Sequence, residues 1–226
     1  MRERTFRILL VEDHPLILDA YKLAFKEIEN NNPLWRFYIA EANSCDTAMA
    51  IFESTNPRRG FDLVFLDLKI PASRDKKILS GEDIGVHVRK KYQDSKLIII
   101  TTFDNAFRIQ NIFRNINPEG FLVKSDITAK ILVRAILDIL QDTPYYSHTV
   151  LQAMRKNIAN EFFLDDLDRK ILYELSIGTK TSNLSKILPL SQATVERKKK
   201  NLKEVFDVQG DDDRDLLERA RELGFI

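Results

Sequence analysis

Five charged or hydroxylated side chains each stand at the end of a short apolar stretch, which would gather them in one place in a folded chain. They are Glu12, Asp13, Asp67, Thr101 and Lys124. Converging carboxylates repel one another and need a cation, and carboxylate oxygens with retained waters suit Mg²⁺. A metal and an ammonium balance the charge on transferring oxygens, and a hydroxyl can bond one of them. The set therefore predicts transfer of a phosphoryl group onto a carboxylate.

These side chains meet only if the stretches before them are neighbouring parallel strands. Residues 63–66 are continuously apolar, as in a strand covered on both faces, and Pro71 stops further pairing. Similar strands are expected at residues 6–11, 37–42, 96–100 and 121–123. Helical spacing of apolar residues separates them, which predicts an α/β fold, a doubly wound five-stranded parallel sheet with the flavodoxin-like strand order. In that order strands 1 and 3 are neighbours, so Glu12 and Asp13 arrive beside Asp67.

Composition narrows the class of protein. The chain has 226 residues, which allow one large domain or two ordinary ones, and its hydrophobic content of 44% is enough for packed cores. The net charge of +1 predicts no polyanion partner, so a nucleic-acid surface would need local clustering of basic residues. The single cysteine, Cys45, excludes an intrachain disulfide and a Cys-built zinc site. No stretch is long enough for a signal peptide or a membrane span, so we expect a soluble cytoplasmic protein.

The histidines give no second site. His14, His87 and His148 are far apart in the sequence, and only His14 lies near the acidic set. A histidine-metal site or a Ser-His-Asp arrangement therefore has no support.

The chain divides into an α/β part and a helical part. We expect the α/β domain over residues 1–142, a linker with a short helix over residues 143–161, and a small all-α domain of four helices over residues 162–226. In the last domain a short helix and a tight turn precede Ser191, which is a good N-cap for a longer helix. This arrangement predicts a helix-turn-helix pair.

The second helix of that pair carries a dense basic run. Its members are Arg197, Lys198, Lys199, Lys200 and Lys203. A solvated helix face is the alternative interpretation of such a run. Because the basic residues lie on the capped helix after the turn, we favour a recognition helix that enters the major groove of DNA.

The α/β part resembles the receiver domain of two-component response regulators over about residues 5–141. The resemblance rests on the motif residues of the strand ends, namely Glu12, Asp13, Asp67, Pro71, Thr101, Phe121 and Lys124. It implies that Asp67 is the phosphoacceptor and that a sensor histidine kinase supplies the phosphoryl group. The segment 72–80 is longer than the usual turn of such domains, and either shapes kinase docking or is a solvated loop.

The same resemblance assigns roles to the other motif residues. Mg²⁺ would be ligated by Asp13, Asp67 and the carbonyl of Lys69, with Glu12 acting nearby. Thr101, Phe121 and Lys124 would form the switch, in which the ring of Phe121 rotates when Thr101 moves toward the phosphoryl group.

The helical part resembles the NarL/LuxR-type DNA-binding domain over its full length. The matching residues are Leu164, Ile171, Leu172, Gly178, Leu184, Ser185, Leu188, Ser191, Thr194, Val195 and the ending 221–226. The family's basic residue and histidine after Thr194-Val195 are here Glu196 and Lys198. Lys199 stands at a position that is usually apolar, so its ammonium is expected to extend to solvent. The resemblance implies that DNA is contacted by Thr194, Arg197, Lys198, Lys200 and Lys203.

Together these patterns predict a response regulator that binds promoter DNA, as a homodimer on two half-sites when phosphorylated. Apart from catalysing its own phosphorylation and slow hydrolysis it is not expected to be an enzyme. The alternative is a phospho-switched module whose helical domain binds a protein, which Glu196 and the acidic residues of that domain favour. A third hypothesis, an Mg²⁺-dependent flavodoxin-like enzyme, lacks substrate-binding residues.

Overall fold

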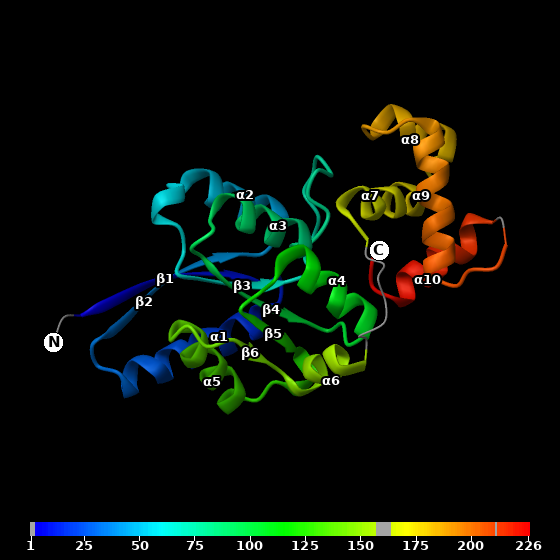
Figure 1. Cartoon of the computed structure of the whole chain (residues 1–226). Coiled ribbons are helices and arrows are strands. Elements are labelled where there is room, and N and C mark those ends of the chain that lie inside the picture. Colours follow the sequence, from blue (N-terminus) through cyan, green and yellow to red (C-terminus); the bar gives the residue numbers. More distant parts are fainter. Residues whose placement is uncertain (1–2, 157–163, 211) are drawn as a thin grey trace.

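A parallel sheet of six strands, in the order β2-β1-β3-β4-β5-β6, forms the centre of the first domain, and a helical domain follows it (Figure 1). The computed structural model describes residues 3–156, 164–210 and 212–226. The strands are β1 (Arg4–Val11), β2 (Trp35–Ala42), β3 (Leu63–Asp67), β4 (Lys96–Thr101), β5 (Gly120–Val123) and β6 (Tyr145–Tyr146). The predicted doubly wound sheet with β1 beside β3 is confirmed.

Helices cover both faces of the sheet, which explains why the central strands are apolar throughout. Alternate residues of each strand point to opposite faces. One face packs against α1 (Pro15–Asn31) and α5 (Ala129–Leu140). The other packs against α2 (Cys45–Ser54), α3 (Gly81–Lys91) and α4 (Ala106–Ile116). Every residue of β3 is buried as a result.

Particular residues determine where the helices next to the strand ends begin. Pro15 occupies the first turn of α1, where its missing N–H is not needed. Asn105 caps α4 by accepting hydrogen bonds from the N–H groups of Phe107 and Arg108. A Cβ at Gly81 would overlap the carbonyl oxygen of Asp67, so glycine lets α3 begin directly against the end of β3. Two 3-10 turns, η1 (Pro57–Arg59) and η2 (Lys124–Asp126), complete the loops.

The sheet has one strand more than the five predicted, and it comes from the segment predicted as a linker. Tyr145–Tyr146 pairs with β5 as β6, and α6 (His148–Lys156) packs against α4 and β5. Val150 of α6 is fully buried. Without this segment β5 would be an exposed edge with unpaired backbone groups. Residues 145–156 therefore extend the α/β domain, and residues 157–161 of the predicted linker lie outside the described residues.

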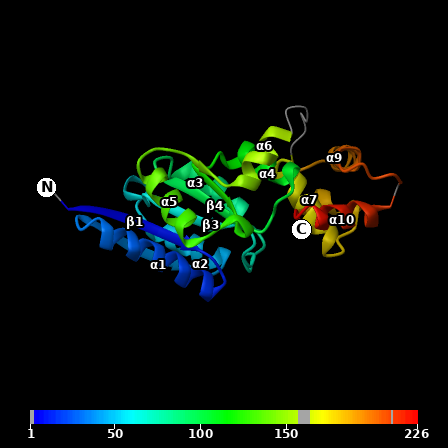
Figure 2. The same ribbon diagram turned by 90° about the horizontal axis from the view of Figure 1, so that it is seen from below.

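The described part of the helical domain contains α7 (Asp166–Ser176), α8 (Thr181–Ile187), α9 (Gln192–Val205) and α10 (Asp213–Glu222). The helices surround a core of buried apolar side chains, among them Leu164, Ile171, Leu172, Leu184, Val195, Leu202 and Leu216. The helix-turn-helix pair predicted from the sequence is α8 and α9. In both Figure 1 and Figure 2, α7 lies toward the receiver-like domain and α9 lies beyond it.

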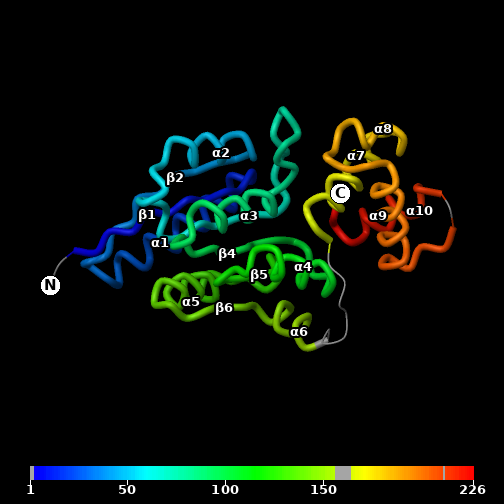
Figure 3. Tube along the Cα trace, turned by 45° about the horizontal axis from the view of Figure 1, so that its top comes forward, coloured from blue at the N-terminus to red at the C-terminus, as the bar shows by residue number. Residues whose placement is uncertain are grey.

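The long segment 72–80 is a projecting loop that holds its own shape (Figure 3). The hydroxyl of Ser73 donates to Asp75 Oδ1 at 2.8 Å, and the N–H of Ser73 donates to the carbonyl of Ile78 at 2.8 Å. The side chain of Arg74 is 97% exposed. The loop is therefore an ordered projection with a basic tip.

Candidate functional site

The four strand ends that carry the predicted chemistry meet at one edge of the sheet. Glu12 follows β1, Asp67 ends β3, Thr101 ends β4 and Lys124 follows β5. These four strands are consecutive neighbours in the sheet and run parallel, so their carboxyl ends lie side by side. Glu12 and Thr101 are fully buried and Asp67 is 4% exposed.

Lys124 joins the two buried carboxylates. Its Nζ lies 2.7 Å from Asp67 Oδ2 and 2.9 Å from Glu12 Oε2. The other oxygen of Asp67, Oδ1, accepts a hydrogen bond from the N–H of Lys69 at 3.0 Å. Burial raises the pKa of Asp67 above its ordinary value, while the hydrogen bond from Lys124 opposes that rise. Burial alone would lower the pKa of Lys124, but its bonds to Asp67 and Glu12 outweigh burial and raise it.

Asp13 and His14 form the more open side of the site. His14 Nδ1 lies 2.7 Å from Asp13 Oδ1 and 3.1 Å from Glu12 Oε1. Its hydrogen bond to Glu12 raises the pKa of His14. The sequence placed His14 near the acidic set without predicting these contacts, which follow from the turn between β1 and Pro15. Donor atoms of Glu12, Asp13 and His14 all lie within 4.8 Å of one another.

Of the three predicted switch residues, Lys124 belongs to the acidic site, and Thr101 and Phe121 contact the loop before α4 and α4 itself. Thr101 Oγ1 accepts a hydrogen bond from the N–H of Phe103 at 3.2 Å. Phe121 is fully buried, and its ring centroid lies 5.5 Å from that of Phe113 on α4. Phe113 in turn contacts Tyr146 of β6 at 5.1 Å. Thr101 thus contacts the loop before α4, and Phe121 contacts Phe113 of α4, which in turn packs against the added strand.

The predicted DNA-contacting residues of α9 divide into two groups. Thr194 is half-buried in the first turn, and Arg197 and Lys200 are exposed. Lys198 instead turns inward, with Nζ 2.8 Å from Asp165 Oδ2 and 2.9 Å from Asp168 Oδ1.

The remaining lysines of the run also bond within the domain. Lys199 is only 9% exposed, and its Nζ donates to Thr181 Oγ1 and Asp213 Oδ2, each at 2.7 Å. The expectation that its ammonium extends to solvent was wrong, because Thr181 and the partly exposed Asp213 supply hydrogen-bond partners within the domain. Lys203 Nζ lies 3.4 Å from Asp213 Oδ1.

Comparisons with known proteins give the same two-domain fold. A scan against protein-family models finds no family that matches. The transcriptional regulatory protein MctR of Rhizobium johnstonii is 24% identical over 211 residues, which cover 92% of this chain and 91% of MctR. RcsB of Salmonella enterica serovar Typhimurium, bound to a promoter with a beryllium fluoride phosphomimetic, matches with a TM-score of 0.65 and 17% identity, over 98% of this chain and 99% of that one.

A LuxR-family response regulator from Aurantimonas sp. SI85-9A1 has a TM-score of 0.51 and 23% identity, over 67% of this chain and 96% of its own. The resemblance predicted from the motifs is therefore confirmed as a fold. The chain has the fold of these response regulators, an α/β domain of the receiver type followed by a helix-turn-helix domain.

Within the described residues, the helices are all too short or too polar to cross a lipid bilayer.

Proposed function

We propose that this chain is a phosphorylation-controlled DNA-binding regulator and that Asp67 is its phosphoacceptor. The observation that carries the proposal is the placement of Asp67. It is nearly buried at a strand end, with Lys124 on one carboxylate oxygen and the N–H of Lys69 on the other. These contacts stabilise the anionic, nucleophilic form and fix the direction in which it meets a phosphorus atom.

The transfer is a displacement at phosphorus. An oxygen of Asp67 forms a bond to the phosphorus of a phosphohistidine on a sensor kinase, and the phosphorus–nitrogen bond breaks. The bonding electrons return to the imidazole, which takes up a proton, and Asp67 becomes an acyl phosphate. Lys124 bonds an oxygen of the transferred group, and the hydroxyl of Thr101 moves toward another. The acyl phosphate is slowly hydrolysed when water attacks the phosphorus, which restores the Asp67 carboxylate and releases inorganic phosphate.

The donor set of the site fits Mg²⁺. Glu12, Asp13 and Asp67 bring three carboxylates to the strand ends, where Lys124 is bonded to Glu12 and Asp67 and His14 lies beside Asp13. Hard oxygen ligands with unbalanced negative charge suit this cation. Asp13, Asp67 and the carbonyl of Lys69 would hold the metal, with Glu12 nearby. Bound there, it supplies positive charge that offsets the charge of the phosphoryl oxygens.

The helical domain would read DNA with the exposed side of α9. Arg197 and Lys200 are exposed cations of this surface, and Thr194 lies about one turn before Arg197, near the helix start. MctR is described as a transcriptional regulatory protein, and RcsB was solved on a promoter. We infer that phosphorylation favours a homodimer that places two such helices on two half-sites.

A protein-binding role for the helical domain is the second candidate. It is favoured by the charge of α9, because Lys198 and Lys199 are bonded to carboxylates within the domain and Glu196 is exposed. Fewer free cations weaken the attraction for phosphates.

The two candidates separate in one experiment. The protein is treated with Mg²⁺ and acetyl phosphate, its mass is measured intact, and it is then mixed with a random DNA pool. We expect one added phosphoryl group and retained DNA whose binding weakens steeply with salt. Phosphorylation without retained DNA would support the protein-binding candidate, and no added phosphoryl group would refute the phosphoacceptor assignment.

A further inference from the structure

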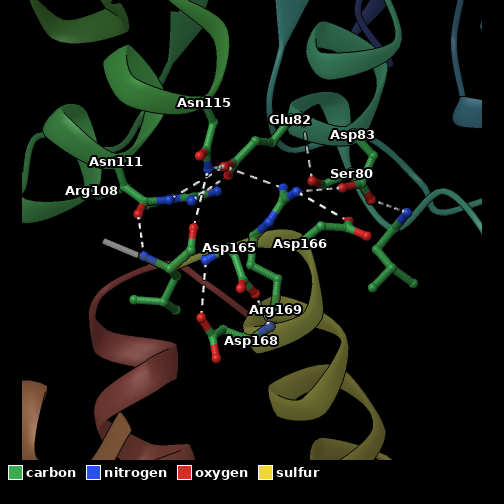
Figure 4. A network of polar contacts seen from close by, with 12 residues as sticks. Ser80, Glu82, Asp83, Arg108, Asn111, Asn115, Asp165, Asp166, Asp168 and Arg169 are labelled. Carbon is green, nitrogen blue, oxygen red and sulfur yellow. Dashed lines mark hydrogen bonds and ion pairs between the residues drawn. The ribbon is translucent and has the colours of Figure 1, made fainter. Parts of the chain in front are cut away.

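A buried group of charged side chains joins the two domains (Figure 4). We call Glu82, Asp83, Arg108 and Arg169 the interdomain cluster. Glu82 is fully buried and bonds both Arg108 Nη1 and, at 3.2 Å, Arg169 Nη1. Arg169 Nη2 lies 2.9 Å from Asp83 Oδ1. Since Arg169 belongs to α7 and the others to α3 and α4, its guanidinium crosses from the helical domain into the receiver.

Two amides of α4 hold the chain where it enters α7. Asn111 Oδ1 accepts a hydrogen bond from the N–H of Leu164 at 2.7 Å. Asn115 Nδ2 donates to the carbonyl of Leu164 at 3.3 Å and to Glu82 Oε1 at 2.8 Å. Leu164 is itself fully buried in the helical core. Both backbone polar groups of this residue are therefore bound by the receiver.

Aromatic side chains also pack against one another between the two domains. The ring of Phe107 on α4 lies 6.1 Å from Phe206 and 5.8 Å from Phe225, centroid to centroid. The guanidinium of Arg108 stands 4.5 Å above the ring of Phe225. A Cβ at Gly224 would overlap the ring of Phe103, so the C-terminal turn approaches the α4 loop as closely as glycine allows.

The part of α7 held by the receiver also holds the recognition helix. Asp165 caps α7, and with Asp168 it binds Lys198 of α9. Arg169, the receiver-bound residue, directly follows Asp168. A continuous set of polar contacts thus runs from α3 and α4 through the first turn of α7 to the middle of α9.

The side chains of α9 that would contact DNA are already exposed to solvent in this arrangement. Arg197 and Lys200 are exposed, and neither forms a hydrogen bond or ion pair with the receiver within the described ranges. In two views α7 lies between the receiver and α9 (Figures 1 and 2). DNA reading therefore does not require the two domains to separate.

We propose that the interdomain cluster fixes the orientation of α9 relative to the receiver, and that Arg169 thereby sets the half-site spacing that a dimer accepts. The inference rests on the proposed DNA-binding function. Recognition helices on flexible tethers reach sites at many separations with gradually changing affinity. Helices fixed to a receiver dimer meet the major groove only when the half-sites lie at the matching distance and on the same side of the duplex. Arg169 is a positioning residue in this scheme.

The test uses the full-length protein with Arg169→Gln, which removes both charge contacts across the boundary and leaves Glu82 bonded to Arg108. Asp83→Asn removes a carboxylate partner of Arg169 from the receiver side. Arg214→Gln is the matched control, because Arg214 is an exposed arginine at the start of α10. The DNA half-site is the sequence that wild-type protein with beryllofluoride selects from a random pool. It is synthesised as pairs separated by a series of one-base-pair steps.

We expect wild type and Arg214→Gln to prefer one spacing by about tenfold over spacings half a helical turn away. Arg169→Gln and Asp83→Asn should bind all spacings within about twofold of one another. Small-angle scattering without DNA should show a larger radius of gyration for these two variants alone.

Three results would overturn the proposal. The first is that the scattering of Arg169→Gln differs from that of wild type but its spacing profile does not. The second is that the scattering of Arg169→Gln equals that of wild type. The third is tighter binding of Arg169→Gln at every spacing without beryllofluoride, which would make the cluster an autoinhibitory contact. If wild type selects no DNA, the proposed function fails, and the scattering comparison still decides whether the cluster fixes the domains.

Discussion

The strand-end site and the interdomain cluster are both built from buried carboxylates and cations, but their charge balance differs. At the strand ends, Lys124 is bonded to Glu12 and Asp67, and Asp13 is a third carboxylate whose ion-pair partner is the exposed His14. In the interdomain cluster, Arg108 and Arg169 are bonded to Glu82, Arg169 is also bonded to Asp83, and Asn115 gives Glu82 a further hydrogen bond. Arg169 also lies 3.4 Å from the more exposed carboxylate of Asp166.

This difference separates a reactive site from a structural one. Unbalanced negative charge at the strand ends leaves room for a cation and makes a carboxylate available for reaction. In the cluster each buried carboxylate is bonded to a guanidinium, and removing one partner leaves the other buried and unpaired. Buried carboxylates therefore have different roles in the two places, and the cations bonded to each carboxylate decide which role it has.

The largest expected effect is loss of the reaction in Asp67→Asn. An amide is not a nucleophile toward phosphorus here, so acetyl phosphate with Mg²⁺ should add no phosphoryl group. Intact mass spectrometry checks this, with Asp94→Asn, an exposed residue of the loop before β4, as the control that reacts normally. Full labelling of Asp67→Asn would assign the chemistry to another residue.

Removal of the metal should have the second largest effect. Chelation of Mg²⁺ should stop phosphorylation of wild type, because the charge on the transferring oxygens is no longer offset. Added Mg²⁺ should also raise the melting temperature of wild type by binding the folded state, and should do so far less in Asp13→Asn. Equal shifts in both proteins would place the metal elsewhere.

Matched substitutions of two fully buried glutamates sharpen the comparison most directly. Glu82→Gln leaves two guanidiniums with too little negative charge and should lower the free energy of unfolding by about 3–5 kcal/mol. Glu12→Gln reduces repulsion among carboxylates while Lys124 keeps Asp67, so its loss should be less than half as large. Urea unfolding at neutral pH measures both, and equal losses would contradict the distinction.

The pH of that measurement matters because of the Glu82 pKa. Burial works to raise this pKa, but Arg108 and Arg169 outweigh burial and hold it below the ordinary value. The stabilisation by ionised Glu82 is therefore complete above the ordinary glutamate pKa of about 4.3 and is lost as pH falls through the lower folded value.

The smallest effects concern neighbouring lysines of α9. Lys200→Ala should reduce the slope of log affinity against log salt by about 1 and leave stability unchanged. Lys199→Met should lower stability by about 1–2 kcal/mol, because Asp213 and Thr181 lose a bonded donor, and should leave the slope unchanged. The reverse pattern would mean that α9 presents another face to DNA.

The sequence alone predicted the sheet order, the helix-turn-helix pair and the meeting of Glu12, Asp67 and Lys124, because apolar runs and their end residues determine these. It did not predict β6, since two tyrosines after a proline carry no periodic signal. Nor did it predict that Lys198 turns inward to Asp165 and Asp168, or that the ammonium of Lys199 bonds Asp213, because these carboxylates lie on other helices.

The interdomain cluster could not be predicted from the sequence, for a different reason. Glu82 and Arg169 each look like an ordinary charge on the polar face of an amphipathic helix. Their burial appears only when two domains, far apart in the sequence, are placed against each other.

Phosphorylation control is tested most directly by measuring the DNA affinity and sedimentation of wild type and Asp67→Asn, each with and without Mg²⁺ and beryllofluoride. Fluorine NMR verifies that Asp67 of wild type is occupied. We predict that beryllofluoride converts wild type to a dimer and raises its affinity by about 5- to 150-fold, and changes neither property in Asp67→Asn. Unchanged mass and affinity in wild type with Asp67 occupied would contradict control of DNA binding by this site.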